Sequence, residues 1–445
     1  MTEENGFGFT RERMREISES KSEPAWVQEQ REKAFEAWEE IPMPTLKDEE
    51  WRRTDISMID FEQFSPMGRT NGKGHGTNFL NSLPDATRSL VDRAGDRGGY
   101  LVQDNSSVKL TEVTESLKEQ GVIFMAMEDA IQEHPDLVQE YFFKKVMTPH
   151  YNKFAALNGA FWSGGAFLYV PKEVEVKIPF EAYFSVDEEN LGLFQHNLIV
   201  MEENASAEFV EIYQSEDNNS EVLNSGITEI YLNANSRFNF ASLQNWGSNF
   251  YDLSNKRAYL ERDARMTWVV STFGGKLVKN HIDTICDGPG AEANTHGLYF
   301  LDDHQHLDTG ILLRLDKPNT YGKSIFKGAL SGKSRSVFQG LIKIQREAQK
   351  SDADLTNKNL LLSTGARADS IPVLEIQADD VKAKHGATVG RVDDDQLYYL
   401  MSRGLSHQQA ERLIVTGFFQ DVLKHIGSKS TVELIQKLVQ QKIEK

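Results

Sequence analysis

A histidine near the C-terminal end of the chain has the surroundings that point most directly to metal or proton chemistry. His385 is followed by Gly386, whose missing side chain leaves the imidazole uncovered on one side. A neutral imidazole can bind a transition metal, or exchange a proton near neutral pH. It can equally be a structural histidine that is hydrogen-bonded in a corner of the fold, and chemistry alone favours this second interpretation.

A second group of candidate metal ligands lies around His304 and His306. On an extended strand both imidazoles would point to one side, near Asp302, Asp303 and Asp308, and such a group could bind a divalent metal. Two histidines alone are a weak indication of a metal site. Structural or surface roles are therefore the favoured interpretation for this pair.

Two other patterns are excluded by their spacing or number. Gly-Lys-Ser occurs at Gly322 and Gly332, but Lys317 and Lys327 stand where a phosphate-binding loop needs its first glycine. Cys286 is the only cysteine, so the chain has no internal disulfide. One thiol also cannot hold an iron–sulfur cluster or a structural zinc by itself, because such sites normally use four ligands with several thiolates.

Composition and charge exclude several classes of protein. The net charge of -18 argues against nonspecific binding to DNA or RNA, because the phosphate backbone would be repelled. The N-terminus has neither the basic nor the apolar part of a secretory signal, and no run approaches the roughly 18 apolar residues of a membrane helix. We therefore expect a cytosolic protein that binds neither nucleic acid nor membrane.

His385 lies at a junction between strand-rich and helical sequence. Residues 370–390 are predicted to form two extended runs on either side of a turn at Asp379 and Asp380. Residues 161–390 are predicted to be the β-rich core, and residues 391–445 a C-terminal helical region. Residues 1–160 are expected to be largely helical, with a helix from Pro24, a flexible Gly/Asn-rich segment near 65–99, and a second helical region from about Asn105 to Asn158.

An internal repeat runs through the strand-rich part of the chain. Similar segments recur about every 30 residues: Ala205-Ser-Ala-Glu-Phe209, Ala234-Asn-Ser-Arg-Phe238, Ala264-Arg-Met-Thr-Trp268 and Ala291-Glu-Ala-Asn-Thr295. The phrase Phe-x-Gly also repeats at Phe326 and Phe338. Short strands at this period, without helices long enough for crossovers, predict a solenoid, for which a parallel β-helix is the natural candidate. Periodicity alone leaves a β-sandwich open as the alternative.

The C-terminal region is predicted to contain three helices. Asp393 and Ser406 are expected to cap the first two, and Gly427 to precede the last. These helices either cover the end of the solenoid, where the last coil would otherwise expose strand edges, or form a docking surface.

Several separate motifs, in the same order, resemble the SufB/SufD family of iron–sulfur cluster assembly proteins. The motifs are Lys153-Phe-Ala-Ala-Leu-Asn158, Val170-Pro171, Gln345-Arg-Glu-Ala-Gln-Lys350, Asn357-Lys-Asn-Leu-Leu-Leu-Ser363, Ile371-Pro-Val-Leu-Glu-Ile-Gln-Ala-Asp-Asp-Val381, His385-Gly-Ala-Thr-Val-Gly390 and Ser402-Arg-Gly404. The segment Trp51-Arg-Arg-Thr-Asp55 is similar to the N-terminal region of the SufD branch in particular. The resemblance covers most of the chain, and it implies a mainly β fold, with a right-handed parallel β-helix core between helical terminal regions.

The resemblance also implies partners and a cargo. Members of the family pair as SufB with SufD through their β-helices, and each binds one SufC ATPase through its C-terminal helices. A nascent iron–sulfur cluster is assembled at the SufB–SufD interface, and His385 matches the SufD histidine that is a candidate ligand. Gly386 replaces the glutamate of SufB, and Ala366 lies near the place of the SufB cysteine, so both favour SufD. Ala383 departs from SufD proteins that carry a cysteine there.

These expectations make the chain a scaffold without catalytic activity. No cofactor is expected on the isolated chain, and the resemblance leaves open whether a flavin binds the complex. We expect Tyr399, Arg403 and Phe418 to lie on or support the surface that docks SufC, although Phe418 suits a core position equally well. Without a partner, the unpaired interface would make a homodimer plausible.

The alternative function is a β-helix enzyme that acts on carbohydrate. It would use Asp302, Asp303 and Asp308 with a basic residue such as Arg314, as in calcium-dependent polysaccharide lyases. Those enzymes are typically exported, and the absence of a signal peptide therefore favours the scaffold.

Overall fold

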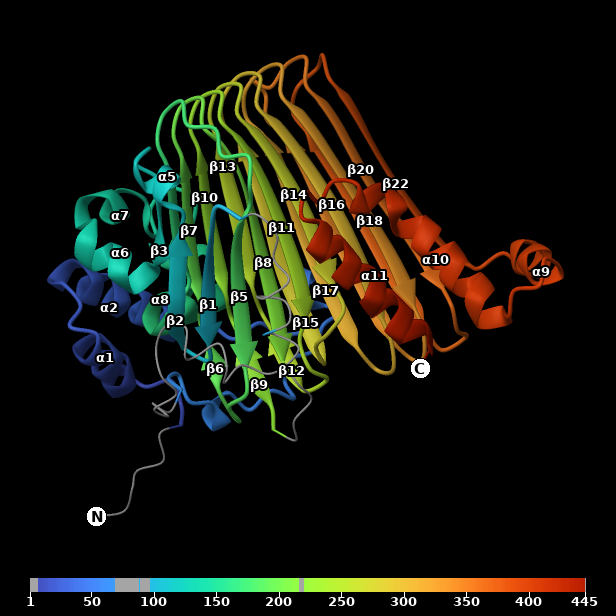
Figure 1. Cartoon of the computed structure of the whole chain (residues 1–445), viewed down its shortest axis with the longest axis horizontal. Coiled ribbons are helices and arrows are strands. Elements are labelled where there is room, and N and C mark those ends of the chain that lie inside the picture. The colour runs from blue at the N-terminus through green and yellow to red at the C-terminus, as the bar shows by residue number, and fades with distance from the viewer. Residues whose placement is uncertain (1–6, 69–87, 89–96, 216–219, 445) are drawn as a thin grey trace.

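The computed structural model describes residues 7–68, 88, 97–215 and 220–444, and two long sheets dominate it (Figure 1). In hydrogen-bonding order, the first sheet contains β2 (Ser107–Val113), β1 (Gly99–Asp104), β5 (Phe180–Val186), β8 (Ser206–Ser215), β11 (Arg237–Asn245), β14 (Arg265–Thr272), β16 (Glu292–Leu301), β18 (Tyr321–Leu330), β20 (Asp352–Leu361) and β22 (Lys382–Arg391). From β13 onward the chain alternates between this sheet and a second one, so sequential strands there lie on opposite walls of a β-solenoid. The predicted β-helix architecture is confirmed.

The second sheet forms the opposite wall of the solenoid. Its main path is β21 (Arg367–Ile376), β19 (Arg335–Ile344), β17 (His306–Leu315), β15 (Leu277–Cys286), β13 (Asn255–Leu260), β10 (Ile227–Leu232), β7 (His196–Met201), β4 (Ala166–Val170) and β3 (Ile123–Ala126). The short strands β6 (Gly192–Leu193), β9 (Val222–Asn224) and β12 (Phe250–Asp252) lie off this path.

Alternate residues of each strand fill the space between the sheets, as the two-residue period of a strand requires. Phe209, Phe240 and Trp268 occupy one row of the first sheet and are all fully buried. The ring centroids of Phe209 and Phe240 are 5.7 Å apart, and those of Phe240 and Trp268 are 5.0 Å apart. Aromatic packing from coil to coil, which the repeat predicted, therefore stabilises the interior.

The register of the repeat differs from the prediction in its second unit. Phe209 pairs with Phe240 rather than with Phe238. The turn before each unit contains a residue with positive φ, namely Asn204, Asn235, Asp263 and Gly290, so the second unit begins at Ser236 and not at Ala234. The slip of two residues was invisible in the sequence because it keeps every side chain on the same face, and Phe238 is indeed also buried.

Phe326 and Phe338 are likewise not equivalent positions of one repeat. Phe326 lies on β18 of the first sheet and Phe338 on β19 of the second. Their ring centroids are 5.1 Å apart across the interior, so they pack against each other.

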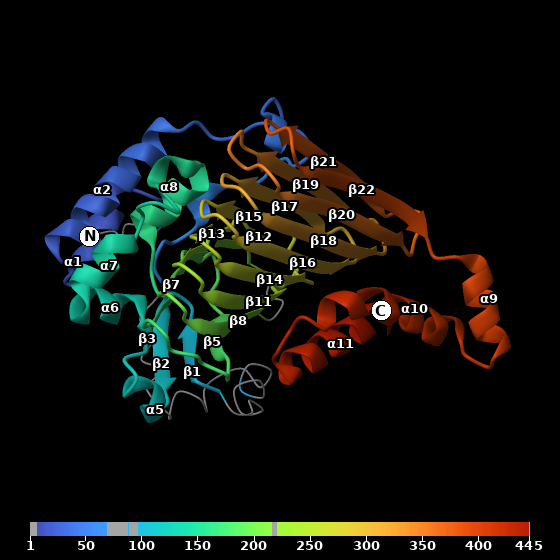
Figure 2. The same cartoon turned by 90° about the horizontal axis from the view of Figure 1, so that it is seen from above.

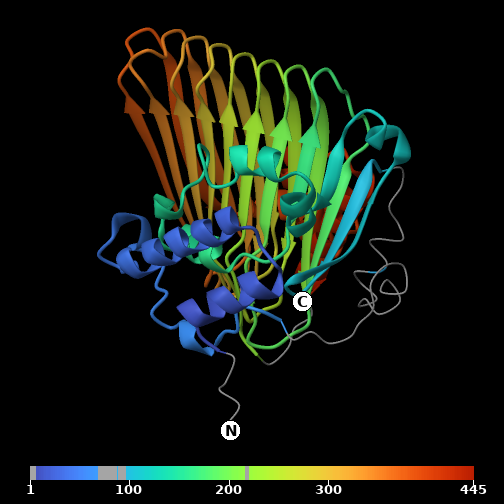
Figure 3. The same cartoon turned by 90° about the vertical axis from the view of Figure 1, so that its left-hand side faces the viewer.

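The N-terminal helices cover the outer face and lower margin of the second sheet (Figure 3). These helices are α1 (Arg11–Ser20), α2 (Ala25–Glu40), α6 (Met127–Glu133), α7 (Pro135–Tyr141) and α8 (Lys153–Phe161), with the 3-10 turns η1 (Glu49–Trp51), η2 (Phe61–Gln63) and η3 (Pro149–Tyr151). The short helix α5 (Glu115–Lys118) instead packs Leu117 into the core between the sheets. Every residue of α8 from Phe154 onward is buried. Buried charges are paired here: Arg31 is 1% exposed, and its guanidinium donates to Glu23 at 2.7 and 2.6 Å.

Part of this N-terminal region is strand where helix was predicted. The segment from about Asn105 onward was expected to be helical, but β1 and β2 form an antiparallel pair, and β1 joins β5 in parallel. β3 extends the second sheet. Short apolar runs do not distinguish a strand from a buried helix. Here these segments pair with strands of the two sheets and extend them. Most of the predicted flexible segment near residues 65–99 lies outside the described residues.

A segment from the N-terminal region, residues 42–64, crosses the outer face of the second sheet and is clamped there. Asp308 is fully buried and accepts hydrogen bonds from Thr54 Oγ1 at 2.6 Å and Lys279 Nζ at 2.9 Å. Lys279 also donates to the carbonyl of Glu50 at 2.9 Å and lies 4.8 Å from the ring centroid of Trp51. The clamp attaches the segment to β15 and β17, so distant parts of the chain are held together.

The C-terminal helices are α9 (Asp394–Ser402), α10 (His407–Leu423) and α11 (Lys429–Glu444). Figure 2 shows α10 and α11 alongside the first sheet and α9 projecting beyond them. Val415 and Phe419 of α10, with Ile435 of α11, pack onto outward-facing residues of the first sheet such as Leu243. These helices therefore cover the face of the first sheet, which neither alternative predicted, and the prediction that they cap the end of the solenoid is wrong for α10 and α11.

Candidate functional site

The solenoid ends in two strands that are paired on one side only. Within the described residues, β22 hydrogen-bonds to β20 alone and β21 to β19 alone. Nine of the ten residues of β22 are exposed. The open sides of both strands present backbone N–H and C=O groups, which favours pairing with a strand from another chain.

His385 lies on β22 at a position that faces the interior of the solenoid. It pairs in register with Leu355 of β20, which is fully buried in the core. Side chains at paired positions of neighbouring strands point to the same side, so the imidazole continues a core row past its last buried member. It is nevertheless exposed, because no further turn follows. Gly386 leaves the adjoining outer position open, since no atom lies within 4 Å of an added Cβ.

Apolar side chains surround this open end. Val373 and Ile376 of β21 are 45% and 42% exposed, and Val389 of β22 is 45% exposed. Pro372 stands in the middle of β21, which an edge strand tolerates because one of its sides needs no N–H donor. The end of the solenoid thus combines unpaired backbone with exposed apolar side chains.

The described residues do not assemble a metal site of their own. Among them, no three histidine, cysteine, aspartate or glutamate side chains are grouped to hold a metal ion. The thiol of Cys286 is buried in β15, and burial raises its pKa, which disfavours the thiolate that binds metals. A site at His385 would therefore need ligands from another molecule.

The group around His304 and His306 has been separated by the fold. His304 lies in an exposed turn, whereas His306 is on β17, bonded to Thr54 at 2.9 Å, and burial lowers its pKa to about 4. Asp302 is bound by Lys442 of α11, and Asp308 belongs to the clamp with Lys279. Two of the three carboxylates that the carbohydrate-enzyme alternative requires are thus occupied in different ion pairs, and the third, Asp303, lies in the exposed turn with His304.

The partner-interface candidates occupy two different settings. Tyr399, on α9, is 56% exposed, and the guanidinium of Arg403 lies 5.1 Å from its ring centroid and donates to its hydroxyl at 3.3 Å. α9 has no buried residue, and Tyr398 beside it is 75% exposed. Phe418 instead is partly buried on α10, packed against the core, with Lys327 Nζ 5.1 Å from its ring centroid. The structure brings together the first two residues but not the third.

Comparisons with known proteins match both halves of the chain to one family. The model for the SufBD protein N-terminal region matches residues 9–181, and the model described as SUF system FeS cluster assembly, SufBD core domain, matches residues 184–418. The chain belongs to the SufBD family. The core match contains His385, Tyr399, Arg403 and Phe418, so each of these residues lies within the shared part of the family.

Relatives of the SufBD family cover nearly the whole chain. The iron–sulfur cluster assembly protein SufB of Bacillus subtilis is 31% identical over 434 residues, which are 96% of this chain and 91% of the relative. A SufBD family protein of Staphylococcus epidermidis has the same identity and coverage, and one from Staphylococcus aureus is 30% identical. These similarities confirm the predicted family and its role in iron–sulfur cluster assembly. Within the described residues, no helix is long and apolar enough to cross a membrane.

The sequence analysis expected strand edges at the last coil, but it did not name the exposed apolar side chains beside them. Val373, Ile376 and Val389 read as ordinary alternating strand residues. Only the register shows that they belong to a last turn with nothing beyond it. The available sequence signal was the abrupt change to helix after Gly390.

Proposed function

We propose that this chain is the SufD-like, non-catalytic scaffold subunit of a cytoplasmic SUF complex. It pairs with a SufB-like paralogue, binds a SufC-like ABC ATPase and contributes His385 to a nascent iron–sulfur cluster shared with SufB. The observation that carries the proposal is the place of His385: it is exposed, on a strand with one unpaired side, at the end of the solenoid core.

The pairing mode follows from the backbone. A partner that adds strands to β22 and β21 would continue both sheets and satisfy their free N–H and C=O groups. The same contact would cover Val373, Ile376 and Val389 and remove them from water. The imidazole of His385 would then lie at the junction of two solenoids, where a partner can supply the thiolate and carboxylate ligands that this chain lacks nearby.

The assignment to the SufD branch rests on residues near His385. Gly386 and Ala366 stand where the resemblance places a glutamate and a cysteine in SufB, and the only thiol of the chain, that of Cys286, is buried in the core. A subunit with this set of side chains supplies one nitrogen ligand and no sulfur. Sulfide and thiolate must then come from the partner.

The proposed surface for the SufC-like ATPase is centred on α9. Tyr399 and Arg403 form an exposed aromatic and cationic pair there, a combination that is enriched where proteins bind each other. Phe418 supports this surface indirectly, because it helps to fix α10 on the first sheet.

The test of the ligand role is a His385→Ala variant, co-expressed with SufB-like and SufC-like partners and purified anaerobically. We expect iron and sulfide on the complex to fall, while the complex itself still forms. His304→Ala is the matched control, because that histidine is also exposed but lies in a turn away from the open end. Normal cluster content in His385→Ala would contradict the ligand role. The visible spectrum of the same sample reports any bound flavin.

The test of the ATPase surface is Arg403→Glu, with Lys429→Glu at the start of α11 as the control for an added negative charge. We expect only Arg403→Glu to lower the amount of SufC recovered with the complex. Full SufC stoichiometry in that variant would contradict the proposed surface. Size-exclusion chromatography of the chain alone tests whether the open end supports a homodimer without partners.

A further inference from the structure

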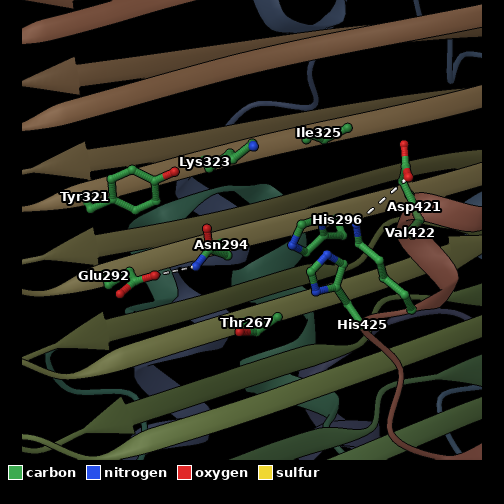
Figure 4. A pocket seen from close by; sticks show the side chains of 11 residues that line it. Thr267, Glu292, Asn294, His296, Tyr321, Lys323, Ile325, Asp421, Val422 and His425 are labelled. Atoms are coloured by element: carbon green, nitrogen blue, oxygen red, sulfur yellow. Dashed lines mark hydrogen bonds and ion pairs between the residues drawn. The ribbon is translucent and has the colours of Figure 1, made fainter.

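A groove of about 670 Å³ lies between the outer face of the first sheet and the end of α10. Its floor is formed by β14, β16 and β18 through residues such as Thr267, Asn294 and Lys323, and its wall by Asp421–His425. Figure 4 shows His296 and His425 side by side next to α10, with Asn294, Glu292 and Tyr321 further along the strands. Its volume lies within the range of about 300–1,000 Å³ that small-molecule sites occupy.

Three side chains of this groove have unused binding capacity. His296 is only 6% exposed, yet none of the described residues hydrogen-bonds to its ring nitrogens. Its ring stacks on that of His425, with centroids 3.7 Å apart and planes 13° apart, and the nitrogens of His425 also lack a described partner. Lys323 forms no ion pair with any described carboxylate. Buried polar groups normally have hydrogen-bond partners, so the buried ring of His296, with His425 and Lys323 partly exposed beside it, leaves donors available to a ligand.

Two cationic side chains, Lys323 and Lys424, line the groove together with two carboxylates, Glu292 and Asp421. Asp421 is shared by Lys327 at 2.9 Å and Lys424 at 3.9 Å, and Glu292 lies 3.6 Å from Arg265. Lys327 and Arg265 lie outside the lining, so Lys323 is the lining cation that has no described carboxylate partner. Asp354, on the neighbouring strand β20, is paired with Lys384. In a chain with a net charge of -18, the ammonium of Lys323 is therefore the group in this groove that would attract an anion.

The pKa values of the two histidines in the groove are both lowered. Burial, the neighbouring imidazole of His425, Lys323 and Lys424 lower the pKa of His296 to about 3. Burial and the same two lysines lower the pKa of His425. Both rings are thus neutral at pH 7, and each can donate one N–H to an anion.

The two ends of the groove differ in chemistry. The end near α10 offers N–H donors and the ammonium of Lys323, whereas the other end offers acceptors and a ring: the carboxylate of Glu292, the amide of Asn294 and the partly exposed Tyr321. An amide of Asn294 already donates to Glu292 at 2.9 Å, which orients both groups. A ligand that fits has an anionic group at one end and a polar ring with hydrogen-bond donors at the other.

We propose that this groove binds the phosphate end of a small phosphorylated ligand of nucleotide size, through Lys323, His296 and His425. Lysine is a common phosphate ligand, and its charge-assisted hydrogen bonds to phosphate are about twice as strong as neutral ones. The site is distinct from His385 and from the exposed face of α9, and it does not depend on the proposed scaffold function. It gives the C-terminal helices a ligand-dependent contact with the solenoid.

The experiment is isothermal titration calorimetry of the purified full chain with inorganic pyrophosphate and, separately, with adenosine diphosphate. We expect pyrophosphate to bind and Lys323→Gln to weaken it by about tenfold or more, as loss of a hydrogen bond to a charged group implies. Lys333→Gln, an exposed lysine in a turn outside the groove, is the matched control and should bind as the unaltered chain does. Circular dichroism checks that both variants fold.

Two outcomes would overturn the proposal. One is the absence of pyrophosphate binding, and the other is equal weakening in Lys323→Gln and Lys333→Gln, which would show a nonspecific charge effect. His425→Gln is a second variant, which removes the partly buried imidazole of the groove wall and leaves every strand residue unchanged. We expect this variant to bind pyrophosphate more weakly too. If adenosine diphosphate binds no more tightly than pyrophosphate, the role assigned to the Glu292 and Tyr321 end is wrong.

Discussion

The two ends of the solenoid are finished in different ways. At the N-terminal end, β2 is antiparallel to β1 and β3 is antiparallel to β4, and α8 buries apolar side chains such as Phe154 and Phe161. At the C-terminal end, β21 and β22 are left with one free side each, and Val373 and Val389 are nearly half exposed.

The contrast shows that the open end is a feature of this chain and not a general weakness of the fold. The C-terminal helices α10 and α11 lie on the face of the first sheet and leave this end uncovered. A natural protein usually blunts an exposed edge with short strands, bulges or a covering element, whereas β21 and β22 are ten residues long and evenly paired. An edge of this kind is consistent with the proposed partner, which would cover it.

The largest expected effect on the free energy of unfolding comes from breaking the buried ion pair between Asp308 and Lys279, where residues 42–64 cross the second sheet. Asp308→Ala would leave the ammonium of Lys279, which is 1% exposed, without its carboxylate in the interior. Removing one partner of a buried ion pair typically costs about 3–5 kcal/mol of the free energy of unfolding. At the open end, Lys384→Ala breaks an ion pair with Asp354 whose lysine is 73% exposed, and we expect a loss below about 1 kcal/mol. Urea unfolding of both variants measures the difference, and similar losses would contradict the comparison.

Two substitutions at positions that face the interior, one on the covered strand β20 and one on the edge strand β22, test the same comparison. Leu355→Ala deletes a fully buried side chain one strand before the end, and we expect it to lower the free energy of unfolding by about 2–5 kcal/mol. Val389→Ala acts on the last strand, where the side chain is 45% exposed, so the isolated chain should lose less than about 1 kcal/mol. Val389→Ala should instead weaken binding to the SufB-like partner. Unchanged partner affinity in that variant would argue against an interface there.

The pH dependence of stability should come from the covered part of the molecule. Burial lowers the pKa of His196, lowers that of His281 to about 3 and lowers that of His306 to about 4. The unfolded chain binds protons at these sites below about pH 6.5 while the folded chain does not, so stability falls as pH falls from 6.5 towards 4. Each group contributes up to about 1.4 kcal/mol per pH unit in this window.

Asp283 acts in the opposite direction, because burial raises its pKa to about 6 and its protonated form is favoured in the folded chain. The measurement is urea unfolding between pH 7.5 and 5 for the unaltered chain and His306→Gln. We expect a smaller loss of stability at low pH in the variant. An identical pH profile would show that His306 is not buried in its neutral form.

The sequence predicted the solenoid well and its edges poorly, for physical reasons. A small residue at the start of each coil and an aromatic ring such as Phe209 in its middle follow from the narrow interior, so they repeat visibly along the chain. The two-residue slip at Ser236 changes no face, and therefore leaves no trace in the pattern. Where α10 and α11 pack could not be read from their amphipathic pattern, because an apolar stripe does not specify which surface it covers.

The prediction of the functional site was limited in the same way, because the sequence does not show which distant residues the fold brings together. The motif around His385 indicated the residue, but only the register with Leu355 shows that it faces the core row at an uncovered end. The groove at His296 and His425 joins side chains that are 129 positions apart in sequence, and only the folded chain shows their stacking.

The most direct test of the open end as a partner interface is amide hydrogen exchange, measured on this chain alone and in complex with its SufB-like partner. Free edge amides exchange faster than those of paired strands, so β21 and β22 should exchange faster than β19 and β20 in the isolated chain. We predict that the complex slows exchange chiefly in β21 and β22. A stable complex in which exchange there is unchanged, and slowed elsewhere, would contradict the account.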